Sequence, residues 1–170
     1  MDTNEPVPTS EPVVQDELRA RLRAVFDEQI PNYGSFNIAY AFGLAGSGGP
    51  CLIGFRNQPI ELVVAPIDAH TLQASESAVS INLTNISAVG IYSADSVELE
   101  MTTGRTFRVT CPPYPTVLLE ASSSGTERTP AVTLDQYGES VDFAEFINFF
   151  ADAVEAGTAP KWAPRRSTGT

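Results

Sequence analysis

The sequence predicts an α+β fold: an antiparallel β-barrel or sandwich of about seven to nine strands, with an amphipathic helix at each end of the chain. Two observations predict it. Apolar residues alternate with small or polar ones over much of residues 36–111, which is the period of a β-strand. Before and after that region, apolar residues recur at three- and four-residue steps, which is the period of a helix.

The first helix is expected over residues 14–30. Its apolar face consists of Val14, Leu18, Leu22, Val25 and Phe26. Pro31 ends it, because the proline ring disfavours the helical conformation at the preceding residue.

Seven strands are expected at residues 36–43, 51–56, 60–66, 78–84, 88–93, 97–102 and 105–111, with two weaker ones at 116–120 and 131–134 around a polar loop, 122–130. The first strand alternates bulky with small residues, which predicts a core on one side of the sheet only. The clearest hairpin has Gly104 in a left-handed position of its turn. Its register places Leu99 opposite Phe107, Val97 opposite Val109 and Glu98 opposite Arg108.

The last helix is predicted from a capping box of Asp142 and Glu145, with Val141 packing against Phe146 and Gly157 as its C-terminal cap. Its apolar face consists of Phe143, Phe146, Ile147, Phe150 and Val154. Four phenylalanines within residues 143–150 exceed what a helix lying in solvent needs. We expect this helix to pack against the sheet or into a partner.

Composition divides the chain into three parts. Residues 1–13 are acidic and rich in proline, which is typical of a disordered tail. Residues 14–157 form a single domain, and residues 158–170 form a flexible basic tail.

The net charge limits the partners. Twenty-one acidic and ten basic residues give a formal charge of −11, which argues against nucleic acid and anionic lipid. No apolar run approaches the roughly 18 residues of a membrane span, so membrane insertion is not expected. The N-terminus lacks the pattern of a signal peptide, and we expect a cytoplasmic protein.

Residues that could carry chemistry are few. Cys51 and Cys111 lie in apolar or β-branched runs, where buried free thiols are favoured over a disulfide bridge between them. The only histidine, His70, is close to Asp68 in a polar turn, where a solvated loop is favoured over a general base. Glu98 and Glu100 are explained by a cross-strand ion pair rather than by glycosidase chemistry. We therefore expect no catalytic residue, no cofactor and no metal.

Other features have a structural interpretation and an alternative. The glycine cluster Gly43, Gly46, Gly48 and Gly49 follows a strand but does not open a helix, so a hairpin loop is favoured over a phosphate loop. Tyr40 and Tyr92 belong either to an interface or to the edge of the core, and the core edge is favoured. Trp162, with Lys161, Arg165 and Arg166, either belongs to a tail that binds nothing or docks into an acidic or aromatic groove.

Residues 79–111, followed by the phenylalanine-rich helix, resemble pleckstrin-homology-like domains, including bacterial PH and GRAM modules. Ile86 and Val89 take the place of that family's "I..V" turn, and residues 143–154 take the place of its capping helix. The chain departs from the family in its extra N-terminal helix, in one or two extra strands and in the loop 122–130. The family's lipid-binding members use a basic first hairpin loop, whereas residues 45–50 contain no Lys or Arg. The resemblance thus implies protein binding rather than phosphoinositide binding.

Two classes of function remain. The first is a non-enzymatic protein-binding, adaptor or assembly module, in which exposed sheet edges recruit a strand and Leu18 and Leu22 contact a partner or a second copy. The second is a small-molecule-binding α+β barrel of NTF2-like or helix-grip type, with possible weak enzymatic activity. Asp68, His70 and Tyr40 would be its polar groups.

Overall fold

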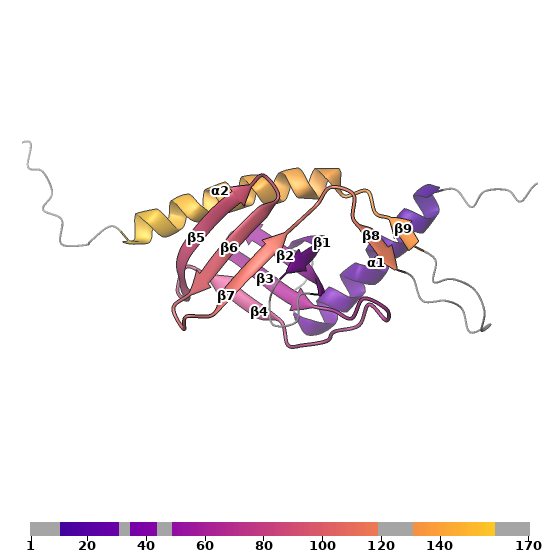
Figure 1. Cartoon of the computed structure of the whole chain (residues 1–170), viewed down its shortest axis with the longest axis horizontal. Coiled ribbons are helices and arrows are strands. Elements are labelled where there is room, and N and C mark those ends of the chain that lie inside the picture. Colours follow the sequence, from indigo (N-terminus) through magenta and orange to yellow (C-terminus); the bar gives the residue numbers. More distant parts are fainter. Residues whose placement is uncertain (1–10, 31–34, 44–48, 119–130, 159–170) are drawn as a thin grey trace, which may run out of the picture.

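The computed structural model describes residues 11–30, 35–43, 49–118 and 131–158 (Figure 1). It contains a seven-stranded antiparallel sheet that curls into a nearly closed barrel, a two-stranded second sheet and two helices. The elements are α1 (Glu11–Gln29), β1 (Asn37–Gly43), β2 (Pro50–Asn57), β3 (Ile60–Pro66), β4 (Val79–Asn82), β5 (Ile86–Ser93), β6 (Ser96–Met101), β7 (Thr106–Thr110), β8 (Thr116–Leu118), β9 (Ala131–Thr133) and α2 (Tyr137–Thr158). The predicted fold class is confirmed.

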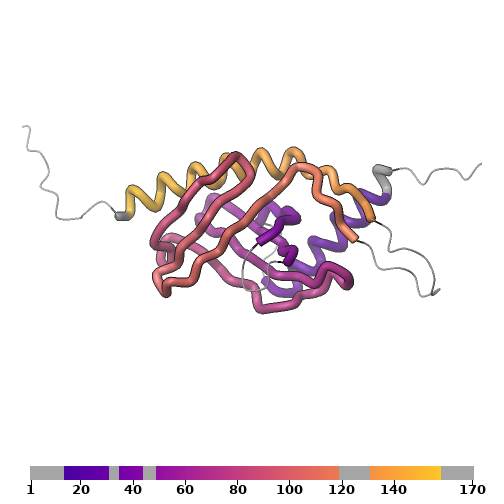
Figure 2. The backbone as a smooth tube through the Cα atoms, in the orientation of Figure 1, coloured from indigo at the N-terminus to yellow at the C-terminus, as the bar shows by residue number. Residues whose placement is uncertain are grey.

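The strand order is β4-β3-β2-β1-β7-β6-β5, so β1 joins the two halves of the barrel. It pairs along its length with β2 but reaches β7 only at Phe42 and Gly43. The sheet therefore has two free edges, β4 and β5. Figure 2 shows the backbone curling from one edge to the other, with α2 along one side.

The larger core lies inside the barrel. Phe143, Phe146 and Phe150 of α2 are at most 3% exposed there, and they pack with inward-facing residues of β1–β7. The rings of Phe143 and Phe146 lie 5.5 and 5.4 Å from the ring of Phe55 on β2. The prediction that the terminal helix packs against the sheet is borne out for three of its four phenylalanines, and Phe149 is half exposed.

A second core lies on the outer face of the sheet. It contains α1, Phe36 and Tyr40 of the β1 region, and Val117 of β8. The prediction of a core on one side of the first strand is wrong, because Ala39 and Ala41 are also buried, inside the barrel. Small side chains occur on that face because the phenylalanines of α2 occupy the space in front of them.

The β6–β7 hairpin has the predicted register, with Leu99 opposite Phe107 and Glu98 opposite Arg108. Gly104 has a φ of 87°, the left-handed conformation that the turn requires. Buried apolar residues therefore face each other across the hairpin, and so do opposite charges, as the pattern predicts.

Both helices begin earlier than the sequence predicts. α1 begins at Glu11 instead of Val14. α2 begins at Tyr137, five residues before the predicted cap Asp142, because Asp135 Oδ1 accepts the N–H of Tyr137 at 3.2 Å. Asp142 is thus inside the helix.

The rest of the predicted capping of α2 is also wrong. Val141 is 41% exposed and is one turn into the helix, so it cannot pack before its start. Gly157 lies within α2 and has no positive φ.

Contact between α1 and the sheet depends on one glycine. Phe26 is fully buried against Gly54 of β2, and a Cβ built at position 54 would lie 2.2 Å from its ring. Only the absence of a side chain allows this close approach.

We therefore expect Gly54→Ala to lower the free energy of unfolding by about 1–3 kcal/mol, the usual cost of overpacking a core. Urea denaturation measures it. The matched control is Gly90→Ala on β5, where an added Cβ has its nearest neighbour at 4.0 Å. Equal stability of the two variants would contradict the packing of Phe26 on Gly54.

Candidate functional site

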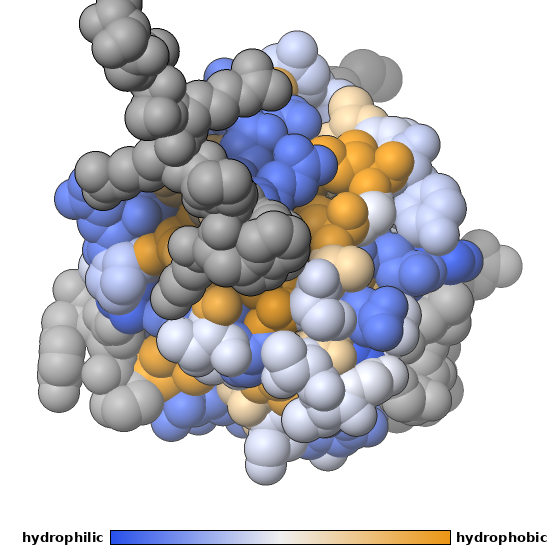
Figure 3. Space-filling view, turned by 90° about the vertical axis from the view of Figure 1, so that its left-hand side faces the viewer, coloured by the Kyte–Doolittle hydropathy of each residue, from blue (hydrophilic) through white to orange (hydrophobic). Residues whose placement is uncertain are grey.

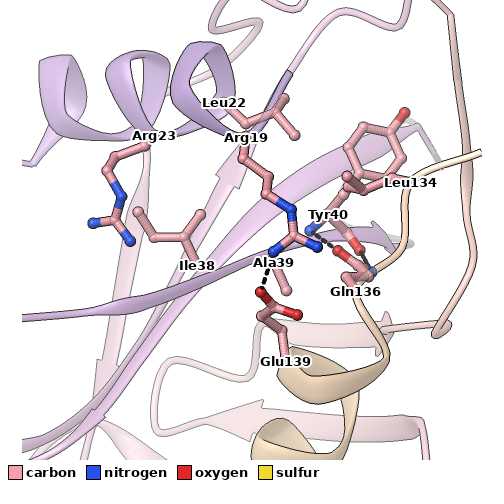
Figure 4. A pocket seen from close by; sticks show the side chains of 9 residues that line it. All are labelled: Arg19, Leu22, Arg23, Ile38, Ala39, Tyr40, Leu134, Gln136 and Glu139. Atoms are coloured by element: carbon pink, nitrogen blue, oxygen red, sulfur yellow. Dashed lines mark hydrogen bonds and ion pairs between the residues drawn. The ribbon is translucent and has the colours of Figure 1, made fainter. Parts of the chain in front are cut away.

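A small cavity of about 110 Å³ lies where α1, β1 and the start of α2 meet (Figure 4). It is lined by Arg19, Leu22, Arg23, Ile38, Ala39, Tyr40, Leu134, Gln136 and Glu139. Ligand pockets usually have volumes of about 300–1,000 Å³. This cavity is too small for such a ligand.

The polar groups of the cavity hold the two helices together. Arg19 Nη1 lies 2.8 Å from Glu139 Oε1 (Figure 4). The same guanidinium donates to the backbone oxygen of Asp135. Burial raises the pKa of Tyr40 to about 12, so its hydroxyl stays protonated at neutral pH. The arrangement contains no nucleophile beside a base.

The side chain of Gln136 bonds to the backbone of β1 at Tyr40, where no described strand pairs with it on that side. Its Oε1 accepts the N–H of Tyr40 at 2.8 Å, and its Nε2 donates to the backbone oxygens of Tyr40 and Pro112, each at 2.7 Å. These bonds satisfy the N–H and C=O groups of Tyr40, which lies in the part of β1 that β7 does not reach. Sequence reasoning missed Gln136, because nothing in a polar stretch before a helix marks one glutamine as buried.

The pair Asp68–His70 forms a turn, as the solvated-loop interpretation predicts. Asp68 Oδ1 accepts the N–H of Thr71 at 2.9 Å and that of His70 at 2.8 Å. These two bonds hold the pKa of the Asp68 carboxyl below its usual value. Neither residue lines the cavity next to Tyr40, so the three polar groups of the small-molecule hypothesis do not come together there.

Cys51 and Cys111 are free and buried, as predicted. Burial raises the pKa of each thiol to about 12, so both stay protonated at neutral pH.

The predicted ion pair is present, with Arg108 Nη2 2.8 Å from Glu98 Oε2. Tyr40 is buried, but Tyr92 is 62% exposed. The placement of Tyr92 at the core edge is therefore wrong. Its ring lies instead under the guanidinium of Arg108 on the outer face.

The two free edges of the sheet differ. β4 has four residues, and the Asn85 side chain bonds to its edge, accepting the N–H of Asn82 at 2.9 Å and donating to Ser80 O at 2.8 Å. β5 has eight residues, contains no charge and no proline, and is exposed over most of its length. Proteins usually protect a long edge strand with a charge, a proline or a cover.

The backbone of β5 directs the N–H and C=O groups of two residues outward. The N–H of Met101 donates to the backbone oxygen of Arg105, just before β7, at 2.8 Å, so the N–H and C=O groups of the odd-numbered residues of β6 point toward β7. Those of the even-numbered residues point toward β5, where Glu98 is opposite Gly90. The N–H and C=O groups of Val89 and Ile91, on either side of Gly90, therefore point away from β6. No other described residue bonds to them.

A groove of about 140 Å³ lies between β5, the β5–β6 turn and α2. It is lined by Ile91, Ser93, Ala94, Ser96, Val97, Phe143, Ala144, Ile147 and Asn148. Figure 3 views the side of the molecule on which β5 and the end of α2 lie, and apolar surface is exposed there between hydrophilic residues. Ile91, at the rim, is 46% exposed.

The elements around the groove carry an excess of negative charge, although Arg108 of β7 pairs with Glu98. α2 contains Glu139, Asp142, Glu145, Asp152 and Glu155, and the β5–β6 hairpin contains Asp95, Glu98 and Glu100. Neither element contains Lys or Arg. The groove therefore favours a ligand with positive charge.

The structure describes only two of the five predicted partner-binding residues. Leu18 and Leu22 are 3% and 4% exposed in the second core, so the prediction that they contact a partner is wrong. Their helical face packs on the sheet of the same chain instead. Trp162, Arg165 and Arg166 lie outside the described residues, as do Gly46, Gly48 and the loop 122–130. At the ends of the glycine loop, the N–H of Gly43 donates to Gly49 O at 3.3 Å, which closes a hairpin as predicted.

Among the described residues, no three or more His, Cys, Asp or Glu side chains lie close enough to hold a metal ion. No helix in the same part of the chain is both long and apolar enough to cross a membrane.

No family model and no curated protein sequence matches the chain. Among solved structures, the chain is similar to inner membrane complex sub-compartment protein 3 from Toxoplasma gondii, with a TM-score of 0.39 and 12% identity. The match covers 78% of this chain and 87% of that one. A likeness this distant carries no inference about function.

The role of Gln136 is testable by Gln136→Ala. We expect the free energy of unfolding to fall by about 2 kcal/mol or more, because each buried backbone group left without a partner costs about 1–3 kcal/mol. Urea denaturation measures the loss. Gln73→Ala, at an exposed position, is the control. A loss no larger than the control's would contradict the bridging role.

The burial of the thiols is testable by alkylation. In the native protein at pH 8 we expect iodoacetamide to leave Cys51 and Cys111 unmodified, because the pKa of each is about 12. In denaturant both react, and mass spectrometry counts the adducts. Rapid labelling of either cysteine in the native state would show that the barrel interior is open.

Proposed function

We propose that this protein is a non-enzymatic protein-binding module of the pleckstrin-homology-like kind, which acts as an adaptor or assembly unit in the cytoplasm. Its β5 edge accepts an extended segment of a partner protein, and the groove between β5 and α2 takes an apolar side chain of that segment.

The observation that carries the proposal is the contrast between the two edges. The edge of β4 is short and bonded to Asn85, whereas β5 keeps the N–H and C=O groups of Val89 and Ile91 directed outward. An added strand forms main-chain hydrogen bonds with such groups. The neighbouring groove supplies specificity, because its apolar lining selects among side chains.

The charge around the site indicates the chemistry of the partner. The groove is bordered by α2 and the β5–β6 hairpin, which contain only acidic charged residues. The expected ligand is thus a segment with an apolar or aromatic residue flanked by Lys or Arg. The same charge disfavours nucleic acid and anionic lipid.

The small-molecule alternative has weaker support. The phenylalanines of α2 fill the barrel interior, where a ligand of that class would bind. The cavity next to Tyr40 holds only about 110 Å³.

A phage-displayed random peptide library tests the proposal with the full chain as bait. We expect enrichment of peptides with basic residues around an apolar one, and their binding, measured by fluorescence polarisation, to weaken with added salt. Ile91→Pro removes an outward N–H without breaking the β5–β6 ladder, and we expect it to weaken binding about tenfold or more.

The matched control is Ser80→Pro on β4, which removes an outward N–H from the other edge. Thermal unfolding checks that each variant folds. If Ile91→Pro does not fold, Asn148→Arg on the helix side of the groove replaces it. A library without binders, or peptides that bind both groove variants as tightly as the native chain, would overturn the proposal.

A further inference from the structure

The groove between β5 and α2 matches the chemistry of one segment of this same chain. We propose that residues 159–170 occupy the groove of their own molecule, with Trp162 against its apolar lining, and thereby regulate access to it. This inference rests on the groove of the proposed function.

Charge complementarity is the first argument. Residues 159–170 contain Lys161, Arg165 and Arg166 and no acidic residue, so they carry three of the chain's ten basic residues. α2, to which the segment is joined, has five acidic residues and no basic one. Asp152 follows Asn148 by four residues, so it lies on the same side of α2 one turn beyond the groove. A basic segment next to this helix face reduces the repulsion among its carboxylates.

Apolar chemistry is the second argument. Trp162 is the only tryptophan in the chain and lies between Lys161 and the two arginines. The groove is lined by Ile91, Val97 and Ala144, and Ile91 is 46% exposed. An indole that covers Ile91 removes apolar area from water, which stabilises the contact.

Chain length allows the contact. α2 ends at Thr158, and Asn148 lies ten residues earlier, about 15 Å back along the helix. The four residues from Thr158 to Trp162 span up to about 14 Å when extended, and the indole adds to that reach. The tail therefore reaches the Asn148 end of the groove. Because the tail is tethered, its effective concentration is about millimolar.

The prolines of the segment are compatible with the free edge of β5. Pro160 and Pro164 are four residues apart, so in an extended segment their missing N–H groups fall on the same side. The other side keeps the N–H groups of Lys161, Ala163 and Arg165. That side can pair with a neighbouring strand.

The fluorescence of Trp162 in the full chain tests the inference directly. We expect its emission to be blue-shifted relative to N-acetyltryptophanamide in the same buffer, and to be quenched less by acrylamide. Asn148→Arg places a positive charge in the groove, and we expect it to return the emission toward that of the free indole. The matched control, Asn57→Arg, changes an exposed residue of β2 that lies across α2 from the groove, and it should leave the emission unchanged.

Three results would overturn the inference. Emission equal to that of the free indole would show that Trp162 does not dock. A blue shift that Asn148→Arg does not alter would place Trp162 elsewhere. A blue shift that disappears on dilution would show that the tail binds a second copy.

Failure of the inference and failure of the proposed function give different experimental results. If the tail docks, Trp162→Ala should tighten the binding of the enriched peptides about tenfold, because it frees the groove. Peptides that bind while Trp162 stays in water support the function and overturn the inference. A docked Trp162 in a protein for which the library gives no binder supports the inference and overturns the function.

Discussion

The structure depends on the burial of three phenylalanines of α2 inside the curled sheet. Phe143, Phe146 and Phe150 fill the space that seven strands enclose but cannot fill with their own side chains. This requirement explains why β1 has alanines at positions 39 and 41 on the inner face, where larger residues would compete for the same volume. This burial also joins the two halves of the sheet in one core, because α2 contacts β1 and β2 as well as β5.

The candidate interaction site follows from the same constraint. α2 lies next to β5 because its apolar face is buried in the barrel, and the space left between helix and strand is the groove. The second core has a different task. It fixes α1 on the outer face through Phe26 and Gly54. Outside this core, the ion pair of Arg19 and Glu139 joins α1 to the start of α2. Leu18 and Leu22 serve the packing of the second core, which makes them unavailable to a partner.

The sequence predicts features that short-range chemistry determines. The β6–β7 register follows from the Gly104 turn and the alternation around it, both of which are local. The second core could not be predicted, because it depends on which distant surfaces meet. Gln136 shows this limit, since its amide bonds to Tyr40, 96 residues away in sequence. To predict that β5 is an open edge also requires the strand order, because a strand is an edge only relative to its neighbours.

Hydrogen exchange measured residue by residue tests most directly whether α2 is part of the barrel core. The account predicts that amides in the middle of α2 exchange only through global unfolding, with the same free energy of opening as amides of β2 and β3. Exchange from α2 at a much lower free energy, while β2 and β3 remain protected, would show a helix that leaves the barrel independently. That result would contradict the account.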